Sequence, residues 1–297
     1  MAPFFVLEDF NGYLLTEKRV SDHTITAYLN DLKQFFDFTG VKTISELQEV
    51  NHQLVRSWIV QLIESNIDKR SVNRKLSTLR SFYKWAQKQS LVENNPMLKV
   101  QGPKQEKRLP SFAKQSEISI EKTEAMFAQD FEGVRDRLIV EMFYQTGIRL
   151  SELIELKQKD VSLRNIKVLG KRNKERIIPI SDGLNALIQK YLEFKKQLGL
   201  DSIYFYVLQN GNKLYPKFVY RKINHYLGSV TSLDKKSPHV LRHTFATHML
   251  NNGAGLETLK DLLGHANLSA TQVYTHNSFA QLNNIYSQAH PRGHKKE

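Results

Sequence analysis

The chain has 297 residues, enough for two domains that each bury a hydrophobic core of their own. Its 43 lysines and arginines outnumber its 30 aspartates and glutamates, which gives a formal net charge of +13, and it contains no cysteine. The missing cysteines exclude disulfides, thiolate metal sites and a cysteine nucleophile, and no apolar run reaches the roughly 18 residues of a membrane span. We therefore expect a cytoplasmic protein with a polyanion, such as DNA or RNA, as its partner.

The first third of the chain has helical periodicity. Apolar residues recur at a spacing near 3.6 in segments 24–36, 54–63 and 72–86, which predicts three amphipathic helices around one core. The outer face of the last segment is basic and polar. It is either an ordinary solvated surface or a face laid against DNA phosphates or into the major groove. The candidate DNA-binding residues on this face are Arg70, Asn73, Arg74, Ser77, Arg80 and Lys84.

A charged stretch without apolar periodicity separates this region from the rest of the chain. It contains Pro103 and Pro110, which favour an extended connection over a helix. We therefore predict a helical domain at 1–102, a linker at 103–114 and a second domain at 115–297.

The second domain is predicted to be mainly helical, with one small β-hairpin. The segment 134–144 has helical character and can end at Gly147, because glycine adopts the left-handed cap conformation without strain. Two short strands within 165–180 are joined by a predominantly basic tip, which predicts an antiparallel hairpin. Helical spacing returns at 184–198 and 218–227. The predicted fold class is mainly α, with two domains and a mixed α+β second domain.

Polar residues able to act on a phosphodiester gather near the C-terminus. His239 and Arg242 are three residues apart, so they share one face of a helix that has Pro238 in its first turn. Two arginines can grip the non-bridging oxygens of a phosphodiester and stabilise the charge that develops in the transition state. No metal or cofactor is needed for this, since the guanidinium groups take the place of the cation.

A tyrosine follows at helical spacing. A helix at 256–263 can end at Gly264, which puts His265 just past its C-terminus. The segment Ser269–Gln272 matches a capping box for a further helix that carries Tyr274 about one turn in. A tyrosine hydroxyl is a weak nucleophile at neutral pH, so it needs an activated phosphorus and a nearby histidine.

Four ordered motifs resemble those of the tyrosine recombinase (phage integrase) family, most closely its chromosome-dimer-resolving Xer branch. They are Thr146-Gly-Ile-Arg149-Leu-Ser-Glu152-Leu, Leu169-Gly-Lys171 followed by Asn173-Lys-Glu-Arg, Ser237-Pro-His239-Val-Leu-Arg242-His-Thr-Phe-Ala-Thr-His, and Leu263-Gly-His265-Ala-Asn-Leu-Ser-Ala-Thr-Gln-Val-Tyr274-Thr-His. The resemblance implies a core-binding domain and a catalytic domain that form a C-shaped clamp around duplex DNA.

The resemblance also implies the phosphate-binding residues. Arg149 and Arg242 would bind the scissile phosphate, Glu152 would support Arg149, and His265 would hydrogen-bond the phosphate. Taken alone, Arg149 could simply form an ion pair with Glu152 on one helix face.

The remaining roles concern the nucleophile and its protons. Tyr274 would be the nucleophile, His239 its acid/base partner, and Lys171 the general acid for the leaving 5′ oxygen. Arg172 stands where close relatives often have glycine, so the posture of Lys171 is left open. Arg172 and Lys174 are further candidates for DNA contact in the hairpin tip.

Other site chemistries fit the sequence poorly. His239 and His243 have the spacing of a zinc-protease helix, but Val240 stands where the general-base glutamate is required. Lys171 is followed by arginine instead of the serine or threonine of a nucleotide-binding P-loop. We expect His243 and His248 to pack or cap.

The resemblance implies cleavage through a 3′-phosphotyrosine link with a free 5′-hydroxyl, and rejoining without ATP. It implies a tetramer on DNA, built from this chain alone or with a second recombinase, and a DNA translocase is a further candidate partner. The sequence leaves open whether the role is chromosome-dimer resolution or mobile-element integration and excision. The alternatives to a recombinase are a type IB topoisomerase and a non-catalytic DNA-binding protein. Residues 281–290 resemble a tail helix that docks on a neighbouring protomer; the alternative is packing on its own domain.

Overall fold

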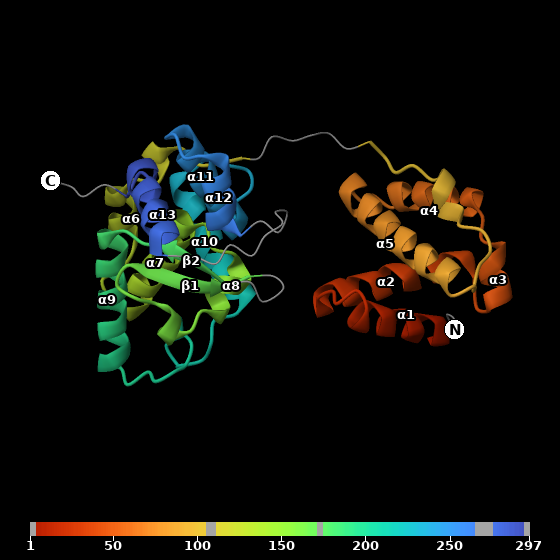
Figure 1. Cartoon of the computed structure of the whole chain (residues 1–297), viewed down its shortest axis with the longest axis horizontal. Helices are drawn as coiled ribbons and strands as arrows, with labels where there is room; N and C mark the ends of the chain where they lie inside the picture. The colour runs from red at the N-terminus through yellow and green to blue at the C-terminus, as the bar shows by residue number, and fades with distance from the viewer. Residues whose placement is uncertain (1–3, 105–110, 171–174, 265–275, 294–297) are drawn as a thin grey trace. The chain divides into compact units, whose positions relative to one another are not determined.

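The computed structural model describes residues 4–104, 111–170, 175–264 and 276–293 (Figure 1). Contacts within the chain divide it into two compact units, Met1–Arg108 and Leu109–Glu297. Each unit has its own hydrophobic core. The predicted mainly helical fold with two cores is confirmed.

The first unit consists of helices joined by short turns. They are α1 (Phe4–Thr16), α2 (Asp22–Thr39), α3 (Ile44–Glu49), α4 (His52–Glu64), α5 (Lys69–Lys88) and the short 3-10 helix Pro96–Lys99. The three predicted helices lie within α2, α4 and α5. Ser21, Asn51 and Asp68 cap these helices by accepting backbone N–H bonds, which satisfies donors that a helix start otherwise leaves free.

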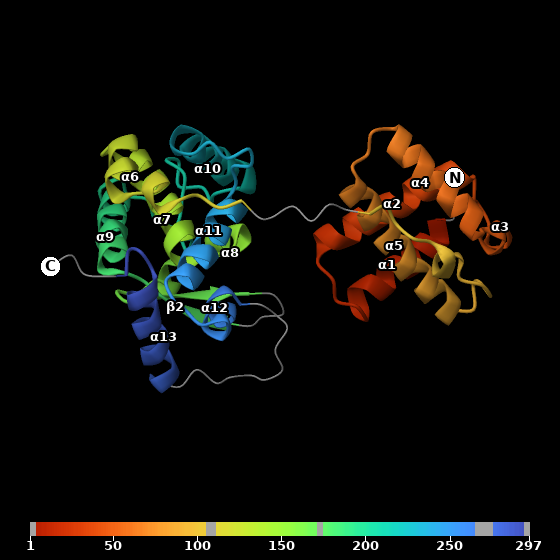
Figure 2. The same ribbon diagram turned by 90° about the horizontal axis from the view of Figure 1, so that it is seen from above.

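The second unit surrounds one buried helix. Its elements are α6 (Ile120–Met126), α7 (Phe131–Thr146), α8 (Leu150–Glu155), β1 (Asn165–Leu169), β2 (Glu175–Pro179), α9 (Asp182–Gln197), α10 (Pro216–Val230), α11 (Pro238–Asn251), α12 (Leu256–Leu263) and α13 (His276–Ala289). The helix α7 is buried along nearly its whole length and packs against α9 on one side and α11 on another, as Figure 2 shows. The strands β1 and β2 pair antiparallel, with Asn165 opposite Pro179, so the predicted hairpin is confirmed.

Two glycines end helices at the predicted positions. Gly147 follows α7 with φ +59°, and Gly264 follows α12 with φ +62°, both in the left-handed region. A Cβ atom added at Gly147 would lie 2.6 Å from Cδ1 of Phe245, so the position also lacks room for a side chain. Arg149 begins α8 as its N-cap residue.

The ends of the predicted linker are attached to the units they leave and enter. The Asn73 side chain donates to the carbonyl oxygen of Pro103 at 2.9 Å. At the other end the Ala113 N–H donates to Oγ1 of Thr244 at 3.0 Å, and Ala113 is fully buried. The second unit therefore includes residues before 115, the expected start, because Ala113 is part of its core.

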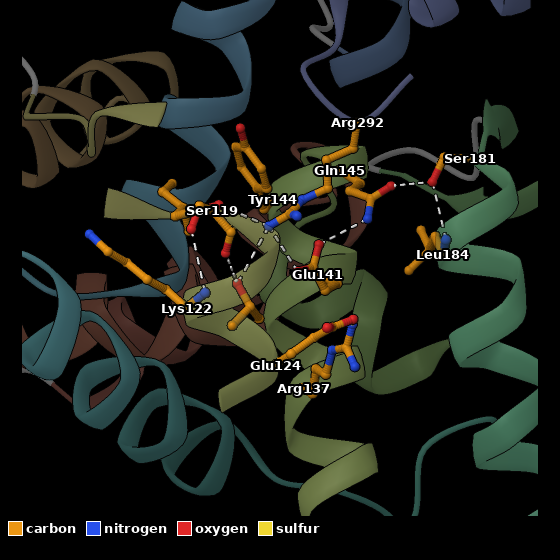
Figure 3. Close-up of polar contacts among 12 residues, drawn as sticks. Ser119, Lys122, Glu124, Arg137, Glu141, Tyr144, Gln145, Ser181, Leu184 and Arg292 are labelled. Carbon is orange, nitrogen blue, oxygen red and sulfur yellow. Dashed lines mark hydrogen bonds and ion pairs between the residues drawn. The ribbon is translucent and has the colours of Figure 1, made fainter. Parts of the chain in front are cut away.

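The C-terminal helix α13 packs on its own unit. Leu282, Tyr286 and Ala289 are buried in the core of that unit, and Arg292 pairs with Glu141 of α7 at 2.9 Å (Figure 3). Of the two alternatives left by the sequence, the described residues have the intramolecular one. Docking on a neighbouring protomer stays a prediction.

His248 packs, as expected. It is buried in α11, and its Nδ1 lies 3.1 Å from the hydroxyl oxygen of Tyr144. Within the described ranges, no helix is long and apolar enough to cross a membrane.

Candidate active site

Arg149 and Arg242 are held by the C-terminal ends of two helices. Arg242 lies on α11, where its guanidinium donates to the carbonyl oxygen of Gly147 and, at 2.7 Å, to that of Leu263. Arg149 donates through Nη2 to the carbonyl oxygen of Gly264 at 2.9 Å. Carbonyl groups at helix ends lack partners in the helix and carry partial negative charge. The ends of α7 and α12 thus bring together two arginines that lie 93 positions apart in the sequence.

Glu152 joins Arg149 to a further arginine. Its Oε1 accepts from Nη1 of Arg149 at 2.8 Å, and its Oε2 accepts from the Arg149 backbone N–H at 2.8 Å. Both carboxylate oxygens also accept from Arg176 of β2, each at 2.8 Å. The Nε of Arg176 donates to the carbonyl oxygen of Leu262 in α12 at 2.8 Å. We call Arg149, Glu152, Arg176 and Arg242 the arginine site.

Sequence reasoning missed Arg176. Its signal was the alternation along β2, in which Arg176 is buried on the same face as Ile178 while Glu175 is exposed. A buried arginine in a strand needs acceptors close by, and the acceptor here is the expected supporting glutamate.

The charges of the arginine site favour an anion. Burial alone would raise the pKa of the Glu152 carboxyl, but hydrogen bonds and charge from Arg176, and then from Arg149, lower it to about 2. Burial, reinforced by the charges of Arg149 and Arg176, lowers the pKa of Arg242 to about 10. Three guanidinium groups against one carboxylate leave a local charge of +2 at neutral pH. Among the described residues, no group of three or more acidic or histidine side chains could hold a metal ion.

The site is open on the side of Arg149, whose side chain is 28% exposed. His239 is exposed in the first turn of α11, one turn before Arg242, because Pro238 occupies the start of that helix as predicted. His243 is half-buried, and burial followed by the charge of His239 lowers its pKa.

Several predicted site residues lie outside the described residues. They are Lys171, Arg172 and Lys174 of the hairpin tip, His265, Tyr274 and the capping box at 269–272. Their chain neighbours are described: β1 and β2 flank the tip, and Gly264, which directly precedes His265, accepts the hydrogen bond from Arg149.

The candidate DNA-binding residues of α5 differ in their surroundings. Arg70, Ser77 and Lys84 are exposed, whereas Asn73 is half-buried. Arg80 donates to the carbonyl oxygen of Val100 at 3.1 Å.

Arg74, whose side chain is 47% exposed, pairs with the buried Asp31 in a cluster that sequence reasoning also missed. Its guanidinium grips both carboxylate oxygens of Asp31 in α2. The same carboxylate accepts from Lys75 and from Thr78, each at 2.9 Å. The signal was an aspartate on the apolar face of α2, four residues before the buried Phe35.

Comparison with known proteins identifies the family. The model of the phage integrase family matches residues 116–281, and that of the phage integrase N-terminal SAM-like domain matches residues 7–90. The chain belongs to the phage integrase family. Tyrosine recombinase XerC of Staphylococcus haemolyticus is 40% identical, over 97% of this chain and 97% of the relative. The same enzyme of Thermodesulfovibrio yellowstonii is 36% identical, over 99% of this chain and 98% of the relative.

Solved structures share the fold of this phage integrase family member. The recombinase XerH bound to its difH substrate after cleavage has a TM-score of 0.71 at 21% identity, over 89% of this chain and 79% of that one. A lambda integrase fragment bound to DNA has a TM-score of 0.67 at 18% identity, over 92% of this chain and 95% of that one. The resemblance inferred from the motifs is confirmed, and the chain is a tyrosine recombinase, an enzyme that cleaves and rejoins DNA.

Proposed function

We propose that the arginine site binds the scissile phosphate of duplex DNA, and that Tyr274 attacks this phosphate to form a 3′-phosphotyrosine link. The observation that carries the proposal is the pair of guanidinium groups of Arg149 and Arg242, fixed by helix ends and by Glu152. Fixed donors need no reorganisation when negative charge develops on the phosphate oxygens.

The reaction needs two proton transfers besides this charge stabilisation. The Tyr274 oxygen forms a bond to phosphorus while the bond to the 5′ oxygen breaks. His239 takes the tyrosine proton, Lys171 gives a proton to the leaving 5′ oxygen, and His265 donates a hydrogen bond to the phosphate. The local charge of +2 matches a transition state with about two negative charges on its phosphorane oxygens.

The reverse reaction uses the same residues. A 5′-hydroxyl attacks the phosphotyrosine link and restores a phosphodiester, so rejoining needs no ATP. Exchange of partner strands between the two steps gives recombination, which requires four active sites and therefore a tetramer on DNA.

In this proposal the helical unit contacts DNA through Arg70, Arg74, Lys84 and their neighbours on α5, and the second unit does so through Arg172 and Lys174 of the hairpin tip. Each unit contacts the duplex in this proposal, with the chain at 103–114 as the linker. The Xer-type relatives favour chromosome-dimer resolution over mobile-element integration, with a second recombinase and a DNA translocase as candidate partners. A protein with this role acts in the cytoplasm, where its DNA lies.

A covalent-adduct assay tests this function. Duplexes bound by the protein are selected from genomic DNA, and the best is rebuilt as a nicked substrate whose cleaved fragment diffuses away. We expect a denaturant-resistant protein–DNA adduct with EDTA present and ATP absent. Tyr274→Phe is expected to bind the same DNA without forming an adduct.

The possible results separate the alternatives. An adduct that persists in Tyr274→Phe would mean that another residue is the nucleophile. Binding without an adduct in either protein would favour the non-catalytic DNA-binding protein. Relaxation of unrelated supercoiled plasmids by the monomer would favour the topoisomerase.

A further inference from the structure

Arg176 is a buried cation that has no contact or proton transfer of its own in the proposed reaction. Only 4% of the residue is exposed, and its guanidinium reaches two other elements, Glu152 of α8 and the Leu262 carbonyl group of α12. A buried charge is costly unless it is well paired. Its position beside Arg149 and Arg242 suggests a use beyond stability.

We propose that Arg176 is a positioning residue for DNA cleavage, which locks the Glu152 carboxylate and thereby sets the direction of the Arg149 guanidinium. The inference rests on the proposed function, because it assumes that Arg149 binds the scissile phosphate.

Glu152 has torsional freedom that Arg176 removes. The terminal torsion of a glutamate has a broad energy minimum, so the Arg149 backbone N–H, which holds Oε2 alone, leaves the carboxylate plane poorly defined. Arg176 bonds both oxygens at 2.8 Å in a two-pronged arrangement, which fixes that plane. Nη1 of Arg149 then bonds an oxygen whose place is already set.

Arg176 also supports the other anchor of Arg149. Gly264, whose carbonyl oxygen accepts from Nη2 of Arg149, lies directly over the Arg176 side chain. A Cβ added at Gly264 would be 3.2 Å from both Cδ and Nη1 of Arg176. Since Nε of Arg176 also holds the Leu262 carbonyl group, one side chain fixes both groups that orient Arg149.

The guanidinium group of Arg176 has the shape that these contacts need. Three of its N–H groups are used: those of Nη1 and Nη2 point side by side toward Glu152, and that of Nε points in another direction toward Leu262. A lysine keeps the positive charge but offers a single ammonium group, which cannot supply this planar pattern. Arg176→Lys therefore keeps the positive charge but removes the contacts that orient Glu152 and Arg149.

The test measures adduct formation at saturating DNA on two nicked substrates. One has an ordinary scissile phosphate, and the other has a neutral methylphosphonate there, which reduces the demand for a cation on the non-bridging oxygens. On the ordinary phosphate we expect Arg176→Lys to slow the reaction roughly tenfold to a hundredfold, as for outer partners of metal ligands, with unchanged DNA affinity. On the methylphosphonate the loss is expected to shrink to about threefold or less.

Two further variants make the result specific. Arg137→Lys changes an arginine that pairs with Glu124 at 2.8 Å in the same unit, outside the arginine site, and should leave both rates unchanged. The double variant Arg149→Lys with Arg176→Lys should be no slower than Arg149→Lys alone, because a residue that acts through Arg149 has nothing left to position.

The outcomes distinguish this inference from the proposed function. Equal losses on both substrates, or a wild-type rate in Arg176→Lys, would overturn the positioning role alone. No adduct with the wild-type protein would overturn the proposed function and this inference with it. If Arg176→Lys does not fold, Arg176→Gln replaces it, and failure of both to fold would show a purely structural arginine.

Discussion

Each unit of the protein has a buried carboxylate that holds two basic side chains. In the helical unit Asp31, 1% exposed, binds Arg74 and Lys75. In the catalytic unit Glu152, 6% exposed, binds Arg149 and Arg176. Both acids stand where an apolar residue would fit the local pattern, yet the two clusters do different work.

The difference lies in where the partners come from. Arg74 and Lys75 are neighbours on α5, so their bonds to Asp31 of α2 hold these two helices together. Arg149 and Arg176 come from different elements, and each also donates to a carbonyl group at the C-terminal end of α12. One acid thus ties two helices together, whereas the other aims a cation at an open site.

The largest effect is expected on the rate of DNA cleavage, when Arg149 is removed. Arg149→Ala should slow cleavage at saturating DNA by roughly 10³-fold, about 4 kcal/mol of transition-state stabilisation. Arg74→Ala should leave that rate within about twofold and lower the salt dependence of DNA binding by about one ion. Single-turnover cleavage and binding titrations at several salt concentrations measure both. Similar rate losses in the two variants would mean that the clusters are alike.

The next prediction concerns stability. Asp31→Asn leaves the buried Lys75 ammonium without its carboxylate, which should cost about 3 kcal/mol of unfolding free energy in the helical unit. Both tryptophans of the chain, Trp58 and Trp85, are buried in this unit, so their fluorescence during urea unfolding reports on it alone. Arg74→Ala is the matched control, since its side chain is 47% exposed and the loss should stay below about 1 kcal/mol. A loss below 1 kcal/mol for Asp31→Asn would contradict the cluster's role.

The third prediction concerns the dependence of stability on pH. Burial lowers the pKa of His290 to about 3. Below pH 6.5 the unfolded chain takes up a proton that the folded chain refuses, so stability falls as the pH drops from 6.5 toward 3, by at most about 1.4 kcal/mol per pH unit. Glu152, with its pKa near 2, keeps its ion pairs throughout most of this window.

The variant His290→Gln tests whether His290 causes this loss of stability at acid pH. Far-UV circular dichroism during urea unfolding at pH 7.5, 6.0 and 5.0 gives the stability of wild type and variant. We expect the difference in unfolding free energy between wild type and His290→Gln to become smaller as the pH falls, because the variant has no imidazole at position 290 to protonate. Burial also lowers the pKa of His248, so part of the acid sensitivity should remain in the variant. A constant gap would assign the sensitivity to other groups.

Local rules were sufficient for the elements that carry the site. Gly147 and Gly264 end helices because only glycine takes the left-handed conformation freely, and Pro238 begins α11 because its fixed φ suits a first turn. The motifs around Arg149 and Arg242 led to the correct family for the same reason: each is a short run of adjacent residues.

Long-range pairing was beyond those rules. Whether Arg176 faces water or the core depends on Glu152, 24 positions earlier, and on Leu262, 86 positions later. Asp31 likewise finds its partners more than 40 positions away. In both cases the polar residue interrupts an apolar pattern, and its partner is set by how elements dock, which periodicity does not encode.

The helix ends that hold Arg149 and Arg242 also make the proposed DNA cleavage depend on complete folding. The carbonyl groups of Gly147, Leu263 and Gly264 can receive these arginines only after α7 and α12 have formed, terminated and docked beside α11. A partly folded chain has the arginines but no arrangement of acceptors to aim them. A chain whose second unit has not finished folding therefore lacks the fixed arginines on which the proposed cleavage depends, so the ability to break a strand arises together with the finished domain.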